Sequence, residues 1–120
     1  MVKSDLEMGK NNLGKLEKTF SILGNEVRLK ILYLLLQNEP KKFNFNEIAE
    51  KTSIKKNKLA YHITLLKNNQ FINNEIRAEK NDRTFSYYTI SNKGKRILRF
   101  IEKMDKDIEE NEEALEKILQ

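Results

Sequence analysis

The middle of the chain carries a dense group of cationic and hydrogen-bonding side chains. They are Lys55, Lys56, Asn57, Lys58, Tyr61 and His62. Ammonium groups pair with the phosphates of a nucleic acid whatever its base sequence. Amide, ammonium and hydroxyl groups can also hydrogen-bond to base edges. The spacing of these residues fits one helix, and we expect them on its exposed side. This chemistry indicates contact with a nucleic acid.

Two short helices joined by a tight turn have to position this group. Asn44 followed by Glu47 forms a capping-box pattern at the start of the first helix. Thr52-Ser53 supplies the turn, and the second helix runs from about Lys56 to Asn69. This is the layout of a helix-turn-helix, whose second helix enters the DNA major groove. A short extended piece around residues 43–45 could pair with a later strand.

The segment after the helix pair has the alternation of a β-hairpin. Ile72, Asn74, Ile76 and Ala78 share one face of the first strand, and Thr84, Ser86, Tyr88 and Ile90 share one face of the second. Three cations lie near the expected tip, namely Arg77, Lys80 and Arg83. Such a hairpin, or wing, could reach a phosphate or the minor groove.

Amphipathic helices are predicted on both sides of this unit. Residues 5–23 carry Leu13, Leu16 and Phe20 at helical spacing, and a strongly apolar helix follows at 26–37. The last helix, for which Ser91 is a candidate cap, bears a heptad seam. The seam consists of Ile97, Ile101, Met104, Ile108, Leu115 and Ile118. We expect these residues and the first-helix set to form a dimer interface, as a coiled coil or antiparallel pair. Packing of the last helix on the chain's own first helix is the alternative.

Composition narrows the classes of function. The 120 residues fit one domain, with no cysteine and no apolar run long enough for a bilayer. Residues 41–99 hold 14 basic and 5 acidic side chains, a net charge of +9, whereas residues 100–120 hold 3 basic and 8 acidic, a net −5. Positive charge therefore gathers on the helix pair and hairpin, although lysines that merely solvate a small domain would give a similar excess.

No catalytic constellation emerges. The glycines are scattered singly, and the acidic side chains between Asp105 and Glu113 are expected to be a solvated helix face. We expect no enzyme activity, no cofactor and no bound metal. His62, the single histidine, is expected to contact phosphate or the core rather than a metal ion.

The segment from Leu23 to Leu98 resembles the winged helix-turn-helix of ArsR-type transcriptional regulators, particularly their archaeal relatives. The likeness lies in LGNEVRLKILYLL, in EIAEKTSIKKNKLAYHITLLKNNQFI, and in YYTI followed by NKGK. It implies a homodimer on a pseudo-palindromic site, with the group from Lys55 to His62 and the wing cations contacting DNA. The cysteine pairs and last-helix histidines of metal-sensing members are missing here. Lys55 and Gln70 depart from the family's usual helix cap and glycine.

Together these features predict a mainly α fold with a small β-hairpin, a winged helix-turn-helix with dimerisation helices at both ends. The expected division is 1–22 for the N-terminal helix, 23–92 for the DNA-binding domain and 93–120 for the C-terminal helix. We expect a cytoplasmic, sequence-specific regulator of transcription that acts by repression and has no membrane partner. The sequence does not indicate whether it has a small-molecule effector. The alternatives are a non-specific architectural DNA binder and a protein-interaction module of a larger transcription or replication assembly.

Overall fold

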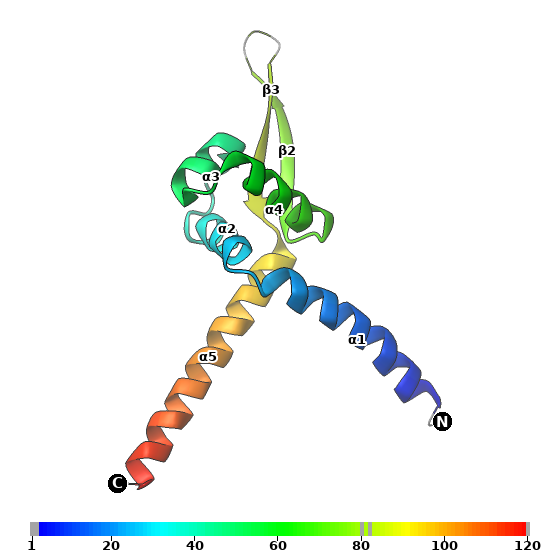
Figure 1. Cartoon of the computed structure of the whole chain (residues 1–120), viewed down its shortest axis with the longest axis vertical. Helices are drawn as coiled ribbons and strands as arrows, with labels where there is room; N and C mark the ends of the chain where they lie inside the picture. Colours follow the sequence, from blue (N-terminus) through cyan, green and yellow to red (C-terminus); the bar gives the residue numbers. More distant parts are fainter. Residues whose placement is uncertain (1–2, 80, 82, 120) are drawn as a thin grey trace.

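A computed structural model describes residues 3–79, 81 and 83–119, with side chains from Asn12 onward. The chain forms helices around a small sheet (Figure 1). In order, the elements are α1 Lys3–Leu23, α2 Glu26–Gln37, β1 Phe43–Asn44, α3 Phe45–Thr52, α4 Lys56–Asn68, β2 Ile72–Ala78, β3 Thr84–Ile90 and α5 Asn92–Leu119. This is the mainly α winged helix-turn-helix arrangement that the sequence predicts, with the three strands in the order β1-β3-β2.

The start of α3 confirms the predicted capping box. Asn44 Oδ1 accepts a hydrogen bond from the Glu47 amide at 2.8 Å, and Glu47 Oε1 accepts from the Asn44 amide at 3.1 Å. These bonds satisfy two amides that the helix itself leaves without partners. α3 ends at Ser53, which adopts a left-handed conformation with φ of 58° and redirects the chain toward α4. The helix pair is therefore defined by local hydrogen bonds at its start and by a left-handed residue at its turn.

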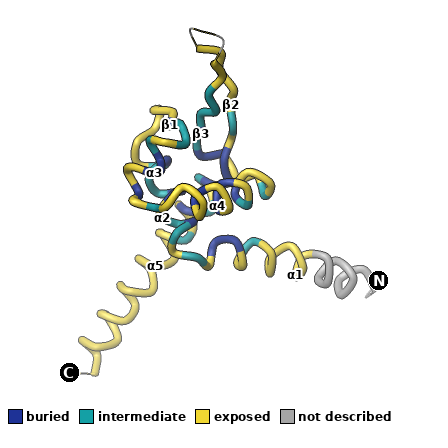
Figure 2. Tube along the Cα trace, turned by 45° about the horizontal axis from the view of Figure 1, so that its top comes forward, coloured by how far each residue is buried: buried dark blue, intermediate teal, exposed yellow. Residues whose placement is uncertain are grey.

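The hydrophobic core lies beneath this helix pair. α2 supplies Ile31, Leu32 and Leu35, each at most 1% exposed, in agreement with the predicted central helix. Leu59 and Leu66 of α4 are fully buried in the same cluster. Figure 2 places the buried residues where α2, α3, α4 and the base of the sheet meet. The core thus fixes one side of α4 and leaves the other free.

The hairpin confirms the predicted sharing of strand faces. β2 and β3 pair antiparallel with Ile72 opposite Ile90 and Asn74 opposite Tyr88, so the expected residues share faces. The predicted extended piece is β1, in which Phe43 pairs with Tyr88. Beyond the core the two long strands project from the body as a narrow wing (Figure 1).

Helices α1 and α5 diverge from the body in a V (Figures 1 and 2). They are not packed along each other, so the alternative in which α5 covers α1 of the same chain is not the arrangement found. Ser91 caps α5 as predicted, because its Oγ accepts from the Gly94 amide at 3.0 Å and donates to the Gln70 carbonyl at 2.7 Å. Among the described residues, no helix has both the length and the apolar character to cross a membrane.

The root of α5 packs very closely on the body. A Cβ atom on Gly94 would lie 2.6 Å from the Phe71 carbonyl oxygen and 2.8 Å from Ile90 Cγ1. One turn later, Leu98 is fully buried in the core. Glycine is therefore required at residue 94 by space and not by backbone conformation.

Candidate nucleic-acid interface

One face of α4 carries the predicted recognition group. Lys55, Lys56, Asn57, Lys58 and Tyr61 are all exposed, and Tyr61 keeps 61% of its surface accessible. The opposite face is formed by Leu59, His62, Ile63 and Leu66, which are buried. The helical period thus separates the side chains that hold α4 from those that could meet a ligand.

The structure corrects the expected place of His62. This residue is only 7% exposed, and its Nδ1 lies 3.1 Å from the Arg28 guanidinium, so it is not on the exposed side with Tyr61. Of the two contacts considered for it, the core contact is found. Burial lowers the pKa of His62, and the charges of Arg28 and Lys58 lower it further. A neutral imidazole is therefore favoured at neutral pH.

The first turn of α4 has the electrostatics of an anion site. Lys55 occupies the N-cap position and makes no side-chain cap bond. The amides of Lys56 and Asn57, the first two of the helix, therefore remain available at the positive end of the helix dipole, beside the side chains of Lys55, Lys56 and Lys58. Asn57 Oδ1 accepts from the Lys58 amide at 2.9 Å. A bidentate contact between Asn57 and a base would require this local bond to be exchanged.

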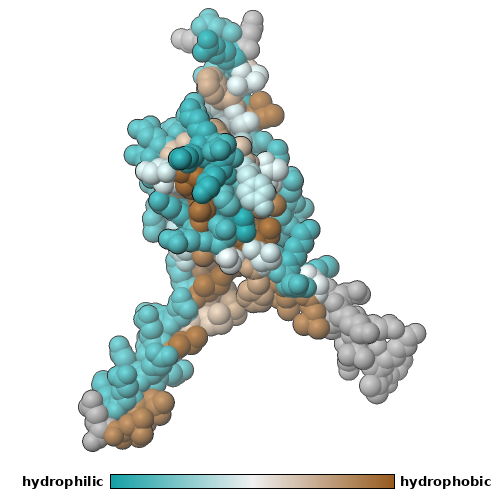
Figure 3. Space-filling view, viewed as in Figure 1, coloured by the Kyte–Doolittle hydropathy of each residue, from teal (hydrophilic) through white to brown (hydrophobic). Residues whose placement is uncertain are grey.

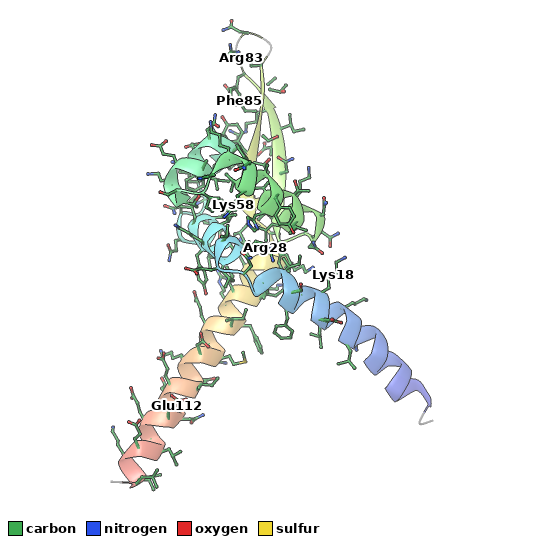
Figure 4. The ribbon with its side chains drawn as sticks, viewed as in Figure 1. Lys18, Arg28, Lys58, Arg83, Phe85 and Glu112 are labelled. Atoms are coloured by element: carbon green, nitrogen blue, oxygen red, sulfur yellow. The ribbon has the colours of Figure 1, made fainter. Side chains whose placement is uncertain are left out.

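The wing cations are not equivalent. Arg83 is exposed near the tip of the hairpin (Figure 4). Arg77 forms an ion pair with Glu75, with Nε 3.4 Å from Oε1, and its guanidinium lies 5.1 Å from the centre of the Tyr87 ring. Lys80 lies outside the described residues. Arg83 is thus the better placed of the two described cations for an outside phosphate.

Two exposed residues escaped the sequence prediction. Thr64 lies one helical turn beyond Tyr61 on the outer face of α4, where its Oγ1 donates to the Ala60 carbonyl at 2.8 Å. The spacing from Asn57 could have identified it, because residues seven apart share a helix face. Ile76 of the wing is 68% exposed. It shares a strand face with Ile72, which is 3% exposed, but the core ends before residue 76.

The predicted dimer residues form exposed apolar surface on both diverging helices. On α1 the exposed fractions are 63% for Leu13, 50% for Leu16 and 65% for Phe20. On α5 the exposed set comprises Met104, Ile108, Leu115 and Ile118, and Phe100 adds a further exposed ring. Ile97 and Ile101, in contrast, are partly buried against the chain's own core. Figure 3 shows apolar surface along both helices and in the crook between them.

Solved structures with the same architecture come from bacteria and an archaeon. The reduced form of the transcriptional regulator YodB from B. subtilis is 25% identical, with a TM-score of 0.64 over 76% of this chain and 85% of that one. A transcriptional regulator homologue from Pyrococcus horikoshii OT3 is 27% identical, with a TM-score of 0.61 over 82% and 95%.

A third structure, from Mycobacterium bovis, shares the fold at 22% identity. It is the homodimeric winged helix-turn-helix DNA-binding domain of Mb0332, described as a possible ArsR-family regulator, with a TM-score of 0.66 over 86% of this chain and 89% of that one. No curated protein sequence matches the chain significantly. The family model described as "Domain of unknown function (DUF7347)" matches residues 16–101, from α1 into the first turns of α5. The chain therefore belongs to the DUF7347 family and has the winged helix fold of transcriptional regulators.

Proposed function

We propose that this protein is a transcriptional regulator of the ArsR type that binds double-stranded DNA as a homodimer at a pseudo-palindromic site and represses transcription. The observation that carries the proposal is the uncapped, lysine-rich start of α4, exposed beside a projecting wing. The regulators that share its fold support the class of activity. The amides of Lys56 and Asn57 at the helix start, with three lysines beside them, suit a phosphate, and the next turn suits base edges.

The residues divide into two roles in this proposal. Lys55, Lys56 and Arg83 bind phosphates and supply affinity that is independent of sequence, with release of counterions. Asn57, Lys58 and Tyr61 read base edges in the major groove. The acidic half of α5 extends away from the wing (Figure 1), so its negative charge is kept far from the DNA backbone.

Dimerisation is proposed to cover the apolar surface of α1 and α5. An isolated small domain would not expose so many large apolar side chains. They are Leu13, Leu16 and Phe20 of α1 and the heptad-seam residues of α5 from Met104 to Ile118. Two copies joined there would present two α4 helices to successive major grooves. The N- and C-terminal segments 1–22 and 93–120 would then form the dimer, and residues 23–92 would bind DNA.

The function is tested by fluorescence anisotropy with the DNA upstream of the gene and a random duplex, across a salt series. Lys58→Ala and Tyr61→Ala should each reduce discrimination between cognate and random duplex by about 1–3 kcal/mol. Lys67→Ala is the matched control, because it removes an exposed lysine from the far end of the same helix. Equal loss in Lys67→Ala and Lys58→Ala would contradict the assigned face. Equal affinity for both duplexes, with steep salt dependence, would favour the architectural alternative.

The interface is tested by light scattering. Ile108→Glu with Leu115→Glu should give monomers, because two carboxylates would be buried in the seam. Lys106→Glu with Lys117→Glu adds the same two carboxylates at exposed positions outside the seam and should leave the dimer intact. A wild-type monomer in isolation would favour the protein-interaction alternative.

A further inference from the structure

Arg28 is a buried cation at the junction of three helices. Only 8% of its surface is exposed, and it lies on α2 where α1 ends beneath α4 (Figure 4). Its Nε donates to the Ile22 carbonyl at 2.6 Å, and its second terminal nitrogen donates to the Ser21 carbonyl at 3.2 Å. The remaining terminal nitrogen lies 3.1 Å from His62 Nδ1. One side chain thus joins the last turn of α1 to the buried face of α4.

The partners of Arg28 explain how its charge is tolerated. Its three partners in these bonds are neutral: two carbonyls and an imidazole. The carbonyls belong to the last turn of α1, where they lack partners within the helix and form the negative end of its dipole. A buried guanidinium that loses an acceptor keeps its charge, because arginine does not deprotonate in proteins. Each of the three acceptors therefore offsets part of the cost of burying this charge.

His62 can accept this bond in only one protonation state. Arginine is always the donor, so Nδ1 must carry the lone pair and the ring proton must lie on Nε2. A second proton would remove the acceptor and place two cations side by side. The charged groups that act on the ring are both cations, Arg28 from α2 and Lys58 from α4 itself. The rings of Tyr61 and His62 meet edge to face, with their centroids 5.1 Å apart. From α1, backbone carbonyls contact Arg28.

We propose that Arg28 and His62 are positioning residues that fix the recognition helix α4 relative to the dimerisation helix α1, so that DNA affinity depends on the hydrogen bond between them. The inference rests on the proposed function, because it assumes that α4 meets DNA and that α1 belongs to the dimer. Neither residue touches DNA in this scheme. They control instead whether the two α4 helices of a dimer stand at the spacing of successive major grooves.

Two substitutions at residue 62 separate the hydrogen bond from packing. In His62→Asn the amide oxygen takes the place of Nδ1 and cannot be protonated, whereas His62→Leu fills the space without an acceptor. At pH 8 we expect His62→Asn to bind the cognate duplex within twofold of wild type. His62→Leu should bind about tenfold more weakly, within the roughly 5–150-fold range typical of coupled sites. Equal affinity of wild type and a folded His62→Leu would overturn the proposal.

The sign of the pH dependence distinguishes positioning from direct contact. If His62 positions α4, lowering the pH from about 7.5 to 5.5 should weaken wild-type binding relative to His62→Asn. If His62 instead touched a phosphate, its protonation would strengthen binding, and that result would refute the inference. Circular dichroism at each pH ensures that the protein compared is folded.

A readout without DNA keeps this inference independent of the proposed function. Amide hydrogen exchange in the last turn of α1 should rise in His62→Leu but not in His62→Asn, since Arg28 would no longer be held against the Ser21 and Ile22 carbonyls. Absence of DNA binding by the wild type, with this exchange pattern intact, would refute the function and leave the junction supported. Unchanged exchange in His62→Leu would refute the junction even in a protein that binds DNA.

Discussion

Gln70 occupies a backbone conformation that its own side chain opposes. Its φ is 62°, immediately after the Asn69 cap of α4. The Phe71 amide donates to the Leu66 carbonyl at 2.9 Å and the Gln70 amide to the Lys67 carbonyl at 3.1 Å. This pair of bonds is the Schellman motif, in which the left-handed residue is usually glycine. Gln70→Gly should therefore stabilise the fold.

The size of the effect follows from two opposing contributions. A side chain in the left-handed region costs about 1–2 kcal/mol, which glycine relieves. Glycine also increases the freedom of the unfolded chain, which costs about 0.4–1 kcal/mol. Gln70 is exposed, so little packing is lost. The net gain in the free energy of unfolding should be about 0.5–1 kcal/mol, or about 2–6 °C in Tm for a domain of this size.

Urea unfolding at a fixed protomer concentration measures this gain, because dimer stability depends on concentration. Asn69→Gly is the matched control, at a neighbouring residue with φ of −99°. It should destabilise the protein, since it removes the bond from Asn69 Nδ2 to the Leu65 carbonyl at 2.8 Å and adds the same entropy. A Gln70→Gly protein as unstable as Asn69→Gly would refute the reasoning from backbone conformation.

Further predictions concern the recognition helix, the wing and acid. Lys55→Ser should raise the free energy of unfolding by about 1 kcal/mol through a new cap, while anisotropy shows weaker binding to every duplex. Arg83→Ala should weaken cognate and random binding alike and lower the salt slope by about one, and a loss confined to cognate DNA would mean that the wing reads sequence. The free energy of unfolding should fall as pH drops below 6.5, because the unfolded chain protonates His62 before the folded one does. It should level off below the lowered pKa of the folded state, and His62→Asn should remove that step from a urea-unfolding series.

The sequence predicted the structural features whose interacting residues lie close together along the chain. Asn44 and Glu47 are three residues apart, so both halves of the capping box are visible in sequence. The shared faces of the hairpin strands follow from the alternation of residue types. Ser91 could be predicted as a cap because it directly precedes a helical pattern. His62 was misplaced because its partner is distant: Arg28 is 34 residues away, and no spacing within α4 indicates it.

The candidate site was predictable in type but not in detail. The lysines of α4 gather in sequence, and their exposure follows once Leu59 and Ile63 define the buried face. The pairing of Arg77 with Glu75 was open to inference, since residues two apart on a strand share a face. The heptad seam, however, gives no sign of where the core ends along α5. Ile97 and Ile101 are partly covered by the body, and only the later positions are free.

Gly94 packs closely on the body near the start of α5, and nearly all of the helix extends beyond this contact. The whole helix spans 28 residues, which is about 42 Å at about 1.5 Å per residue, and Gly94 is its third residue. A tilt of about 10° at its root would sweep the far end through about 7 Å, more than one helical turn. Because a Cβ at residue 94 would lie 2.6 Å from the Phe71 carbonyl oxygen, even a single methyl group would force the helix root or its neighbours to shift. The direction of the outer part of α5 thus depends on the close contact at Gly94.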